Sequence, residues 1–225
     1  MARAVSVETM RKSDAYTIEN LVPSKELMYR AGSGIFSEVD DYDFEAKDGS
    51  FIHGWYGPVA IAAGKGNNAG DGFVVAKLLH DRGIPVDIIL MDEKFSDDGK
   101  FYYDICAEAG VPSYVYSEDM DLGKYRTFVD CLLGTGFSGD VREPMASFIR
   151  GINSAAEAGA FVVAADINSG LNGDTGEGSL YVRSDLTISI GEFKFGHFRG
   201  RASDAMKDKV NVDIGIEIIG EAEEM

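Results

Sequence analysis

Glycines and polar side chains alternate in the segment from Gly64 to Gly72, which reads Gly-Lys-Gly-Asn-Asn-Ala-Gly-Asp-Gly. Glycine lets a ligand approach the backbone closely, and the free N–H groups at the start of a helix attract anions. Gly64, Gly66 and Ala69 fit the loose G-x-G-x-x-G/A pattern of dinucleotide-binding turns, which is weak by itself. No Gly-Lys-Ser or Gly-Lys-Thr follows, which excludes the nucleoside triphosphate P-loop.

Three polar residues in this segment exceed what a phosphate-binding turn needs: Asn67, Asn68 and Asp71. They indicate a ligand with further polar groups to recognise. The alternative is an ordinary turn whose Asn and Asp residues cap the following helix.

Two aspartates, Asp130 and Asp166, occur at or near the ends of apolar runs that read as buried strands. A buried carboxylate without a partner is costly. A cation shared with Asn68 and Ser169 would supply that partner, because all four side chains offer oxygen atoms. The alternative is that each aspartate accepts hydrogen bonds from the N–H groups of its own loop.

Two further residues are candidates for proton or phosphate chemistry. Asp140 lies in a loop before Pro144, where it is either a functional carboxylate or a turn residue. Lys194 stands between Phe193 and Phe195, so it either reaches a phosphate or loses a proton when desolvated, or it is a surface lysine between packed aromatics.

Apolar periodicity predicts the elements that position these residues. Helices are expected at 6–20, at 24–39 with Ser24 as cap, after the glycine segment, at 97–109 and from Pro144 to about 158. Strands are expected at 59–63, 86–90, 113–116, 127–133, 161–165, 186–190 and 210–219, and residues 40–57 form an acidic, aromatic connector.

This alternation predicts an α/β fold, a three-layer αβα sandwich with a Rossmann-like, mainly parallel sheet. Ligands of such sheets bind beyond the carboxyl ends of the strands. Polar or glycine-rich loops follow Ala63, Leu133, Ala165 and Ile190. Four loops at one edge would build a single site.

Composition narrows the class of protein. The 225 residues fit one α/β domain, 1–225, that includes the N-terminal helices, and a net charge of −17 argues against nucleic acid as a partner. There is no apolar run that would cross a membrane and no secretory signal, and Cys106 and Cys131 read as reduced core thiols of a cytoplasmic protein. The three histidines stand far apart, without zinc-ligand spacing.

Five separated segments together resemble the YjeF N-terminal domain family, the NAD(P)H-hydrate epimerases. They are 67–72, 130–136, 166–171, 174–176, and Lys194 with Gly196. Thr9-Met10-Arg11, Leu27-Met28, Arg30-Ala31-Gly32 and Asp213-Ile214-Gly215-Ile216 are also similar to that family. The resemblance covers nearly the whole chain.

The resemblance implies an isomerase of nucleotide repair that interconverts the R and S hydrates of NADH and NADPH at carbon 6, with a bound potassium ion. It implies Asn68, Asp130 and Ser169 as potassium ligands, and as substrate contacts Asn67, Asn68, Ala69, Gly70, Asp71, Gly134, Thr135, Gly136, Phe137, Ser138, Gly139, Asp140 and Asp166. It also favours a homodimer, and a dehydratase acting on the S epimer would be a separate chain.

The expected chemistry needs no abstraction of a carbon-bound proton. The ring nitrogen expels the hydroxyl to give a planar iminium, which water attacks from the other face, so one acid and one base are required. Asp140 and Asp166 are the acid and base candidates, with Lys194 orienting a phosphate or assisting proton transfer.

The chain departs from the family pattern at two positions. Ala69 stands where the family usually has glycine, which requires a negative φ at this residue. Asn168 stands where the family has proline, which frees an N–H group and is expected to loosen the corner that places Ser169.

Two competing functions remain open at this level. A nicotinamide-dependent dehydrogenase would use Asp92, after the next strand, to bind a ribose. A non-catalytic nucleotide-binding or scaffold protein would keep the site without turnover.

Overall fold

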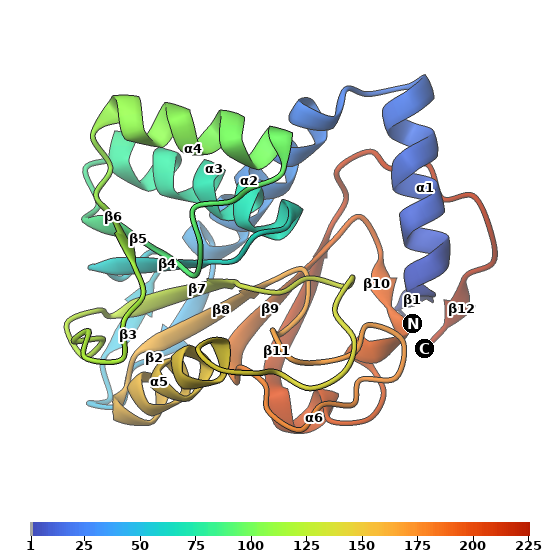
Figure 1. The fold of residues 1–225 in the computed structure, drawn as a ribbon. Helices are drawn as coiled ribbons and strands as arrows, with labels where there is room; N and C mark the ends of the chain where they lie inside the picture. The colour runs from blue at the N-terminus through green and yellow to red at the C-terminus, as the bar shows by residue number, and fades with distance from the viewer. Residues whose placement is uncertain (1) are drawn as a thin grey trace.

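A seven-stranded parallel sheet runs through the computed structural model, which describes residues 2–225 (Figure 1). The order of its strands is β11-β9-β8-β7-β4-β5-β6. Their bounds are β4 Val59–Ala63, β5 Val86–Leu90, β6 Ser113–Val115, β7 Thr127–Cys131, β8 Phe161–Ala165, β9 Ser184–Ile190 and β11 Met206–Val212. The predicted α/β sandwich with a parallel sheet is confirmed.

Helices cover both faces of the sheet. Figure 1 shows α2 (Ser24–Asp40), α3 (Asn67–Asp81) and α4 (Asp97–Ala109) on one face, and α5 (Met145–Ala158) and the short α6 (Ala202–Ala205) on the other. In strand β4, successive side chains pack against the helices on opposite faces of the sheet. Val59, Ile61 and Ala63 join the apolar cluster that contains residues of α2 and α3, whereas Ala60 and Ala62 join the cluster that contains residues of α5. Successive strand side chains point to opposite faces, so a strand buried on both faces is apolar throughout.

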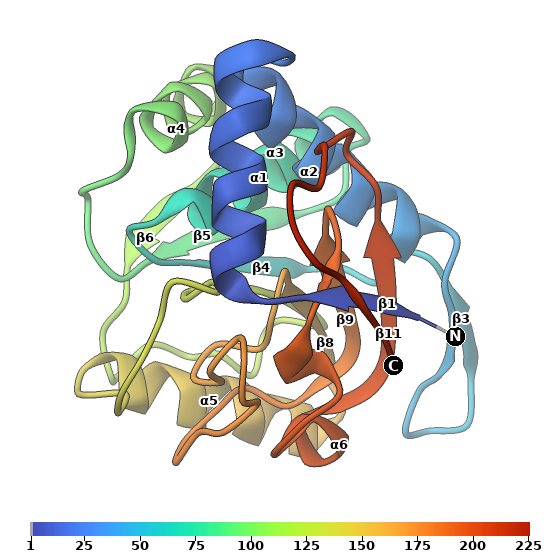
Figure 2. The same ribbon diagram turned by 90° about the vertical axis from the view of Figure 1, so that its right-hand side faces the viewer.

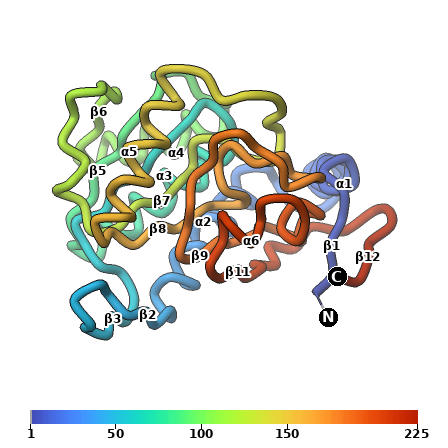
Figure 3. The backbone as a smooth tube through the Cα atoms, turned by 90° about the horizontal axis from the view of Figure 1, so that it is seen from below, coloured from blue at the N-terminus to red at the C-terminus, as the bar shows by residue number. Residues whose placement is uncertain are grey.

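A second, three-stranded sheet joins the two ends of the chain. Strand β1 (Arg3–Val5) pairs in parallel with β10 (Phe193–Lys194) and antiparallel with β12 (Glu223–Glu224), and the 3-10 helix η1 (Phe195–His197) follows β10. Helix α1 (Val7–Asn20) leads out of this sheet and stands outside the main sandwich (Figure 2). The hairpin of β2 (Asp43–Glu45) and β3 (Phe51–His53) lies on the side away from α1 (Figure 3).

Several predicted boundaries are corrected by the structure. Ser24 is the first residue of α2 and not its cap, because Pro23 occupies the capping position without a side-chain hydrogen bond. The last strand of the main sheet, β11, covers Met206–Val212, where it pairs with β9, instead of 210–219. Within residues 2–225, no helix is long and apolar enough to cross a membrane.

Candidate functional site

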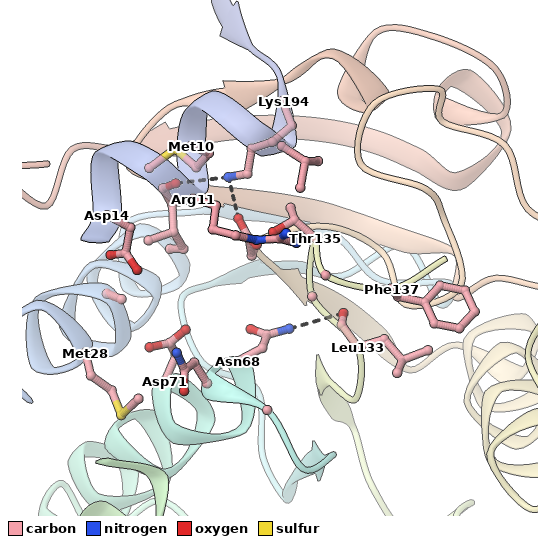
Figure 4. Close-up of a pocket in the computed structure, with 18 of the residues that line it drawn as sticks. Met10, Arg11, Asp14, Met28, Asn68, Asp71, Leu133, Thr135, Phe137 and Lys194 are labelled. Carbon is pink, nitrogen blue, oxygen red and sulfur yellow. Dashed lines mark hydrogen bonds and ion pairs between the residues drawn. The ribbon is translucent and has the colours of Figure 1, made fainter. Parts of the chain in front are cut away.

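One cavity of about 740 Å³ opens at the carboxyl ends of the central strands (Figure 4). The loops after β4, β7, β8 and β9 all contribute to its lining, as the sequence predicted for a single site. Helix α1 forms a further wall that the sequence did not predict. A cavity of this size lies in the range usual for small-molecule sites.

The predicted residues that line this cavity come from three of those loops and from β10. They are Asn67, Asn68, Asp71, Gly134, Thr135, Gly136, Phe137, Asp166 and Lys194. Ala69 and Gly70 are buried within the first turn of α3, next to these residues. The negative φ expected at Ala69 is confirmed, because Asp166 is the non-glycine residue at which φ is positive in the described chain.

Lys194 is buried, with 1% of its side chain exposed, so the surface-lysine reading is wrong. Its ammonium group forms an ion pair with the carboxylate of Asp166. It also donates to Ser189 Oγ at 3.2 Å and to two backbone carbonyl oxygens, of residue 190 at 3.0 Å and of residue 192 at 2.9 Å. The oxygens around this buried ammonium hold it as a fixed positive charge at the cavity wall.

Asp166 carries backbone strain as well as charge. Its φ is +65°, a region that aspartate tolerates better than most residues. Burial alone would raise the pKa of its carboxyl group, but the charge and hydrogen bond of Lys194 outweigh burial and lower it. Asp166 is therefore ionised at neutral pH and able to accept a proton.

His197 lies behind this ion pair and connects its two members. Its Nε2 donates to the backbone carbonyl of Asp166 at 2.7 Å, and its Nδ1 accepts from the backbone N–H of Lys194 at 3.0 Å. Burial, together with the charge of Lys194, lowers the pKa of His197 to about 4, so the imidazole is neutral. Sequence reasoning missed this role, although the spacing of three residues after Lys194 was visible.

Two further carboxyl groups face the cavity, and their pKa values move in the opposite direction. Burial raises the pKa of Asp71 well above its usual range, and the charges of Asp166 and Asp14 add to the effect. Burial and the charge of Asp166 also raise the pKa of Asp14, a residue of α1 that the sequence did not single out. One cavity thus contains carboxyl groups that favour opposite protonation states, which suits acid–base chemistry.

Asp130 and Ser169 are hydrogen-bonded to each other, and Ser169 and Asn68 both donate to the carbonyl oxygen of residue 133. Asp130 accepts from Ser169 Oγ at 2.6 Å and from the Ser169 N–H at 2.8 Å. Asn68 Nδ2 donates to the carbonyl oxygens of residues 133 and 165, at 3.3 and 3.1 Å, while its Oδ1 is buried without a hydrogen-bond partner. Burial raises the pKa of Asp130 to about 6, only partly offset by these hydrogen bonds.

This oxygen set fits a cation. It offers a fully buried carboxylate, a hydroxyl and an unpartnered amide oxygen, and no ion pair to Asp130 occurs within residues 2–225. Over the same residues, no group of three or more His, Cys, Asp or Glu side chains is placed to hold a metal ion. The donors of this set are one carboxylate and neutral oxygens, which are the ligands that hard cations prefer.

The corner next to this set is rigid, contrary to the expectation at Asn168. The amide of Asn168 is fully buried and donates to Ser184 Oγ at 2.9 Å and to the carbonyl oxygens of residues 182 and 205, at 3.0 and 3.1 Å. Its Oδ1 accepts from Thr187 Oγ1 at 2.7 Å. Side-chain hydrogen bonds thus replace the rigidity that proline would supply.

Part of the predicted substrate loop lies apart from the main cavity. Ser138, Gly139 and Asp140 are exposed, and Asp140 accepts from Ser179 Oγ at 2.8 Å. Gly139 and Asp140 line a smaller cavity of about 370 Å³, which shares Phe137 with the main one. The structure thus brings Asp166 and Lys194 together but leaves Asp140 in the adjoining cavity.

The geometry expected of a dehydrogenase is not favoured at Asp92. Its carboxylate forms an ion pair with Lys65 at 2.8 Å, and the hydrogen bond from Lys65, with a smaller contribution from its charge, lowers the pKa of Asp92. Asp92 is already engaged by the loop that would hold the cofactor phosphate.

A family model described as "YjeF-related protein N-terminus" matches residues 24–196 of the chain. An NAD(P)H-hydrate epimerase of Lentilactobacillus buchneri is 34% identical, and the match covers 96% of each chain. One from Oenococcus oeni is 36% identical over 85% of this chain and 87% of the relative.

Longer relatives and a solved structure extend the comparison. The bifunctional NAD(P)H-hydrate repair enzyme Nnr of Archaeoglobus fulgidus is 35% identical over 84% of this chain, but the chain spans only 37% of that relative's length. The crystal structure of yeast ynu0, YNL200c, has a TM-score of 0.74 and 19% identity, and covers 97% of this chain and 96% of its own. At that identity the likeness concerns the fold alone.

Proposed function

This chain belongs to the family of YjeF-related protein N-termini, and from that premise we propose that it is an NAD(P)H-hydrate epimerase. It would interconvert the R and S forms of hydrated NADH and NADPH. The observation that carries the proposal is the single cavity that contains both an ionised carboxylate, Asp166 paired with Lys194, and Asp71, a carboxyl group whose pKa burial raises well above its usual range.

The roles of these groups follow from their protonation states. Asp71 donates a proton to the departing hydroxyl, and the ring nitrogen supplies the electron pair that forms the planar iminium. Water then attacks the opposite face of the ring and gives a proton to Asp166. Lys194 and the neutral His197 hold Asp166 in the conformation in which its carboxylate faces the cavity.

The nucleotide part of the substrate would bind along the loops at the cavity mouth. The backbone N–H groups at the start of α3, from Asn67 onward, suit a phosphate. We retain the loop from Gly134 to Asp140 as a further substrate contact, with Asp140 reached from the adjoining cavity as a second candidate for proton transfer.

We propose potassium as the cation held by Asn68, Asp130 and Ser169, on the basis of the unpartnered amide oxygen and of a buried carboxylate that has hydrogen bonds but no ion pair within residues 2–225. When bound, it would supply positive charge and rigidity beneath the cavity. Potassium chloride should raise the unfolding temperature above that in choline chloride at equal ionic strength, and Asp130→Asn should remove the difference. Equal temperatures in the two salts at pH 8 would contradict the assignment.

The activity is tested with the purified R hydrate and a dehydratase specific for the S form, by following return of the reduced cofactor. The protein should accelerate this return over spontaneous epimerisation in the presence of potassium. Asp166→Asn should abolish most of the acceleration, and Asp104→Asn, an exposed carboxylate of α4 paired with Lys100, should leave it unchanged. No acceleration by the wild type would refute the function.

Partners and setting are further proposals. The family resemblance supports a homodimer, which sedimentation would test. The bifunctional relatives suggest that a dehydratase removes the S epimer, from a separate chain or from a fused domain. The buried thiols of Cys106 and Cys131 support a reducing, cytoplasmic setting.

A further inference from the structure

We propose that Asp14 of helix α1 is a further catalytic residue, which shares one proton with Asp71 so that the two carboxyl groups act together as the acid. The proposal rests on the epimerase function. Asp14 precedes residues 24–196, which match the family model.

Helix α1 presents one face to the cavity. Val7, Met10, Arg11, Asp14 and Ile18 all line it, at the spacing of three and four residues that places side chains on one side of a helix. Asp14 is the carboxylate on that face, since Glu8 and Glu19 are exposed and do not line the cavity. Met10 and Met28 contribute apolar lining nearby, which lowers the polarity around the carboxyl group.

The position of α1 is fixed at several points. Ser6 caps the helix, and the N–H of Val7 donates to Asp174 Oδ1 at 2.7 Å. Farther along, Ser13 Oγ and Thr17 Oγ1 accept from backbone N–H groups of the C-terminal segment, at residues 219 and 217, at 2.9 and 3.0 Å. Asp14 lies between these attachments, so its carboxyl group is held against the cavity instead of being free to leave it.

The charges around Asp14 leave it without a cation. Asp166 after β8 acts on it with negative charge, Asp71 of α3 adds a second carboxyl group, and the ammonium of Lys194 is already in contact with Asp166. Arg11, on the same helix, extends toward Thr135 and away from Asp14 (Figure 4). Within residues 2–225 no hydrogen bond contributes to the pKa of Asp14 or Asp71, and Lys194 acts on Asp71 through its charge alone.

Two largely buried carboxyl groups that line one cavity, neither of them paired with a cation, cannot both ionise at little cost, so they retain a proton between them. Figure 4 shows Asp14 and Asp71 on the same side of the cavity. Burial and neighbouring negative charge raise the pKa of each group, in agreement with this arrangement.

The shared proton fits the proposed reaction. It passes to the hydroxyl oxygen as the carbon–oxygen bond breaks, the bonding electron pair stays on that oxygen, and water leaves. The nitrogen lone pair becomes the second bond of the iminium. Asp14 and Asp71 are then both ionised beside a cationic ring, whose charge offsets their repulsion in this intermediate.

The test compares Asp14→Asn with Glu8→Gln, which removes a carboxylate from an exposed position of the same helix. Asp14→Asn should lower kcat by roughly tenfold to a hundredfold with KM changed by less than about twofold, because an acid of this kind contributes on the order of a hundredfold or more. The high-pH limb of kcat should move to lower pH, since Asp71 loses a neighbouring negative charge. Glu8→Gln should match the wild type.

Carboxyl carbon NMR of the wild-type protein provides a readout that needs no variant. Asp14 and Asp71 should titrate together, above the range of an exposed aspartate. An active wild type with an unchanged kcat and pH limb in Asp14→Asn, or with both groups titrating near 4, would overturn this inference and leave the function standing. A wild type without epimerase activity would overturn both.

Discussion

Replacing Lys194 with methionine tests the ion pair at the centre of the site. Methionine keeps most of the apolar volume but removes the charge, so the carboxylate of Asp166 loses its partner. Breaking a buried ion pair costs about 3–5 kcal/mol. The Asp166 side chain is 16% exposed, and solvent at the cavity reduces the penalty, so we expect the lower end, about 3 kcal/mol.

The pH dependence of this loss has a defined sign. In the wild type the pKa of Asp166 is lowered, so its contribution to stability is present above the unfolded value and is lost as pH falls through the folded one. Without Lys194 that pKa rises because burial then dominates. The difference in unfolding free energy between Lys194→Met and the wild type should therefore be largest near pH 7 and smaller near pH 4.

The assay is urea unfolding of the wild type, Lys194→Met, Asp166→Asn and the double variant, with kcat measured for each. Asparagine accepts the positive φ at Asp166, so the backbone is preserved. The double variant should lose about 2 kcal/mol less unfolding free energy than the sum of the two single losses. It should nevertheless remain inactive. A loss below about 1 kcal/mol for Lys194→Met, or additive losses, would refute the reasoning.

Three further predictions concern stability. Because the pKa of His197 is lowered to about 4, the free energy of unfolding should fall by about 3 kcal/mol as pH drops from about 6.5 to 4. His197→Asn should make the free energy of unfolding depend less on pH in this range. Asn168→Ala should cost about 2–4 kcal/mol in urea unfolding, because it removes the buried acceptor of the Thr187 hydroxyl and the buried donor to Ser184 and to the carbonyl oxygens of residues 182 and 205. Gly72→Ala should cost about 1–3 kcal/mol by the same measurement, since a Cβ there would lie 2.8 Å from Cys131 Sγ and from Ile61 Cγ2.

Each of these has a simple contradicting result. An unchanged pH slope in His197→Asn would mean that the histidine is not buried in its neutral form. A free energy of unfolding within about 0.5 kcal/mol of the wild type for Asn168→Ala would show that Asn168 does not stabilise the corner. The same result for Gly72→Ala would show that α3 tolerates a methyl group at that position. Ser50→Ala, in the exposed β2–β3 hairpin, serves as a control for all three.

The fold and the main loops of the site followed from local patterns. Apolar runs such as Val59–Ala63 are buried on both faces of the sheet, so every residue in them is apolar and the strand can be recognised from the local sequence. Parallel strands then place the residues after them at one edge, which is why Asn68, Asp130 and Ser169 could be grouped before the structure was known.

Other members of the site depended on contacts between distant segments, which no local pattern encodes. Asp140 and Lys194 both read as ambiguous, but packing leaves Asp140 exposed beside Ser179 and buries Lys194 against Asp166. Asp14 reaches the cavity because β1 and the C-terminal segment hold α1 there. The sequence thus determined which residues end each strand, whereas the tertiary structure decided their charge states, because burial and neighbouring charges set the pKa of each carboxyl group.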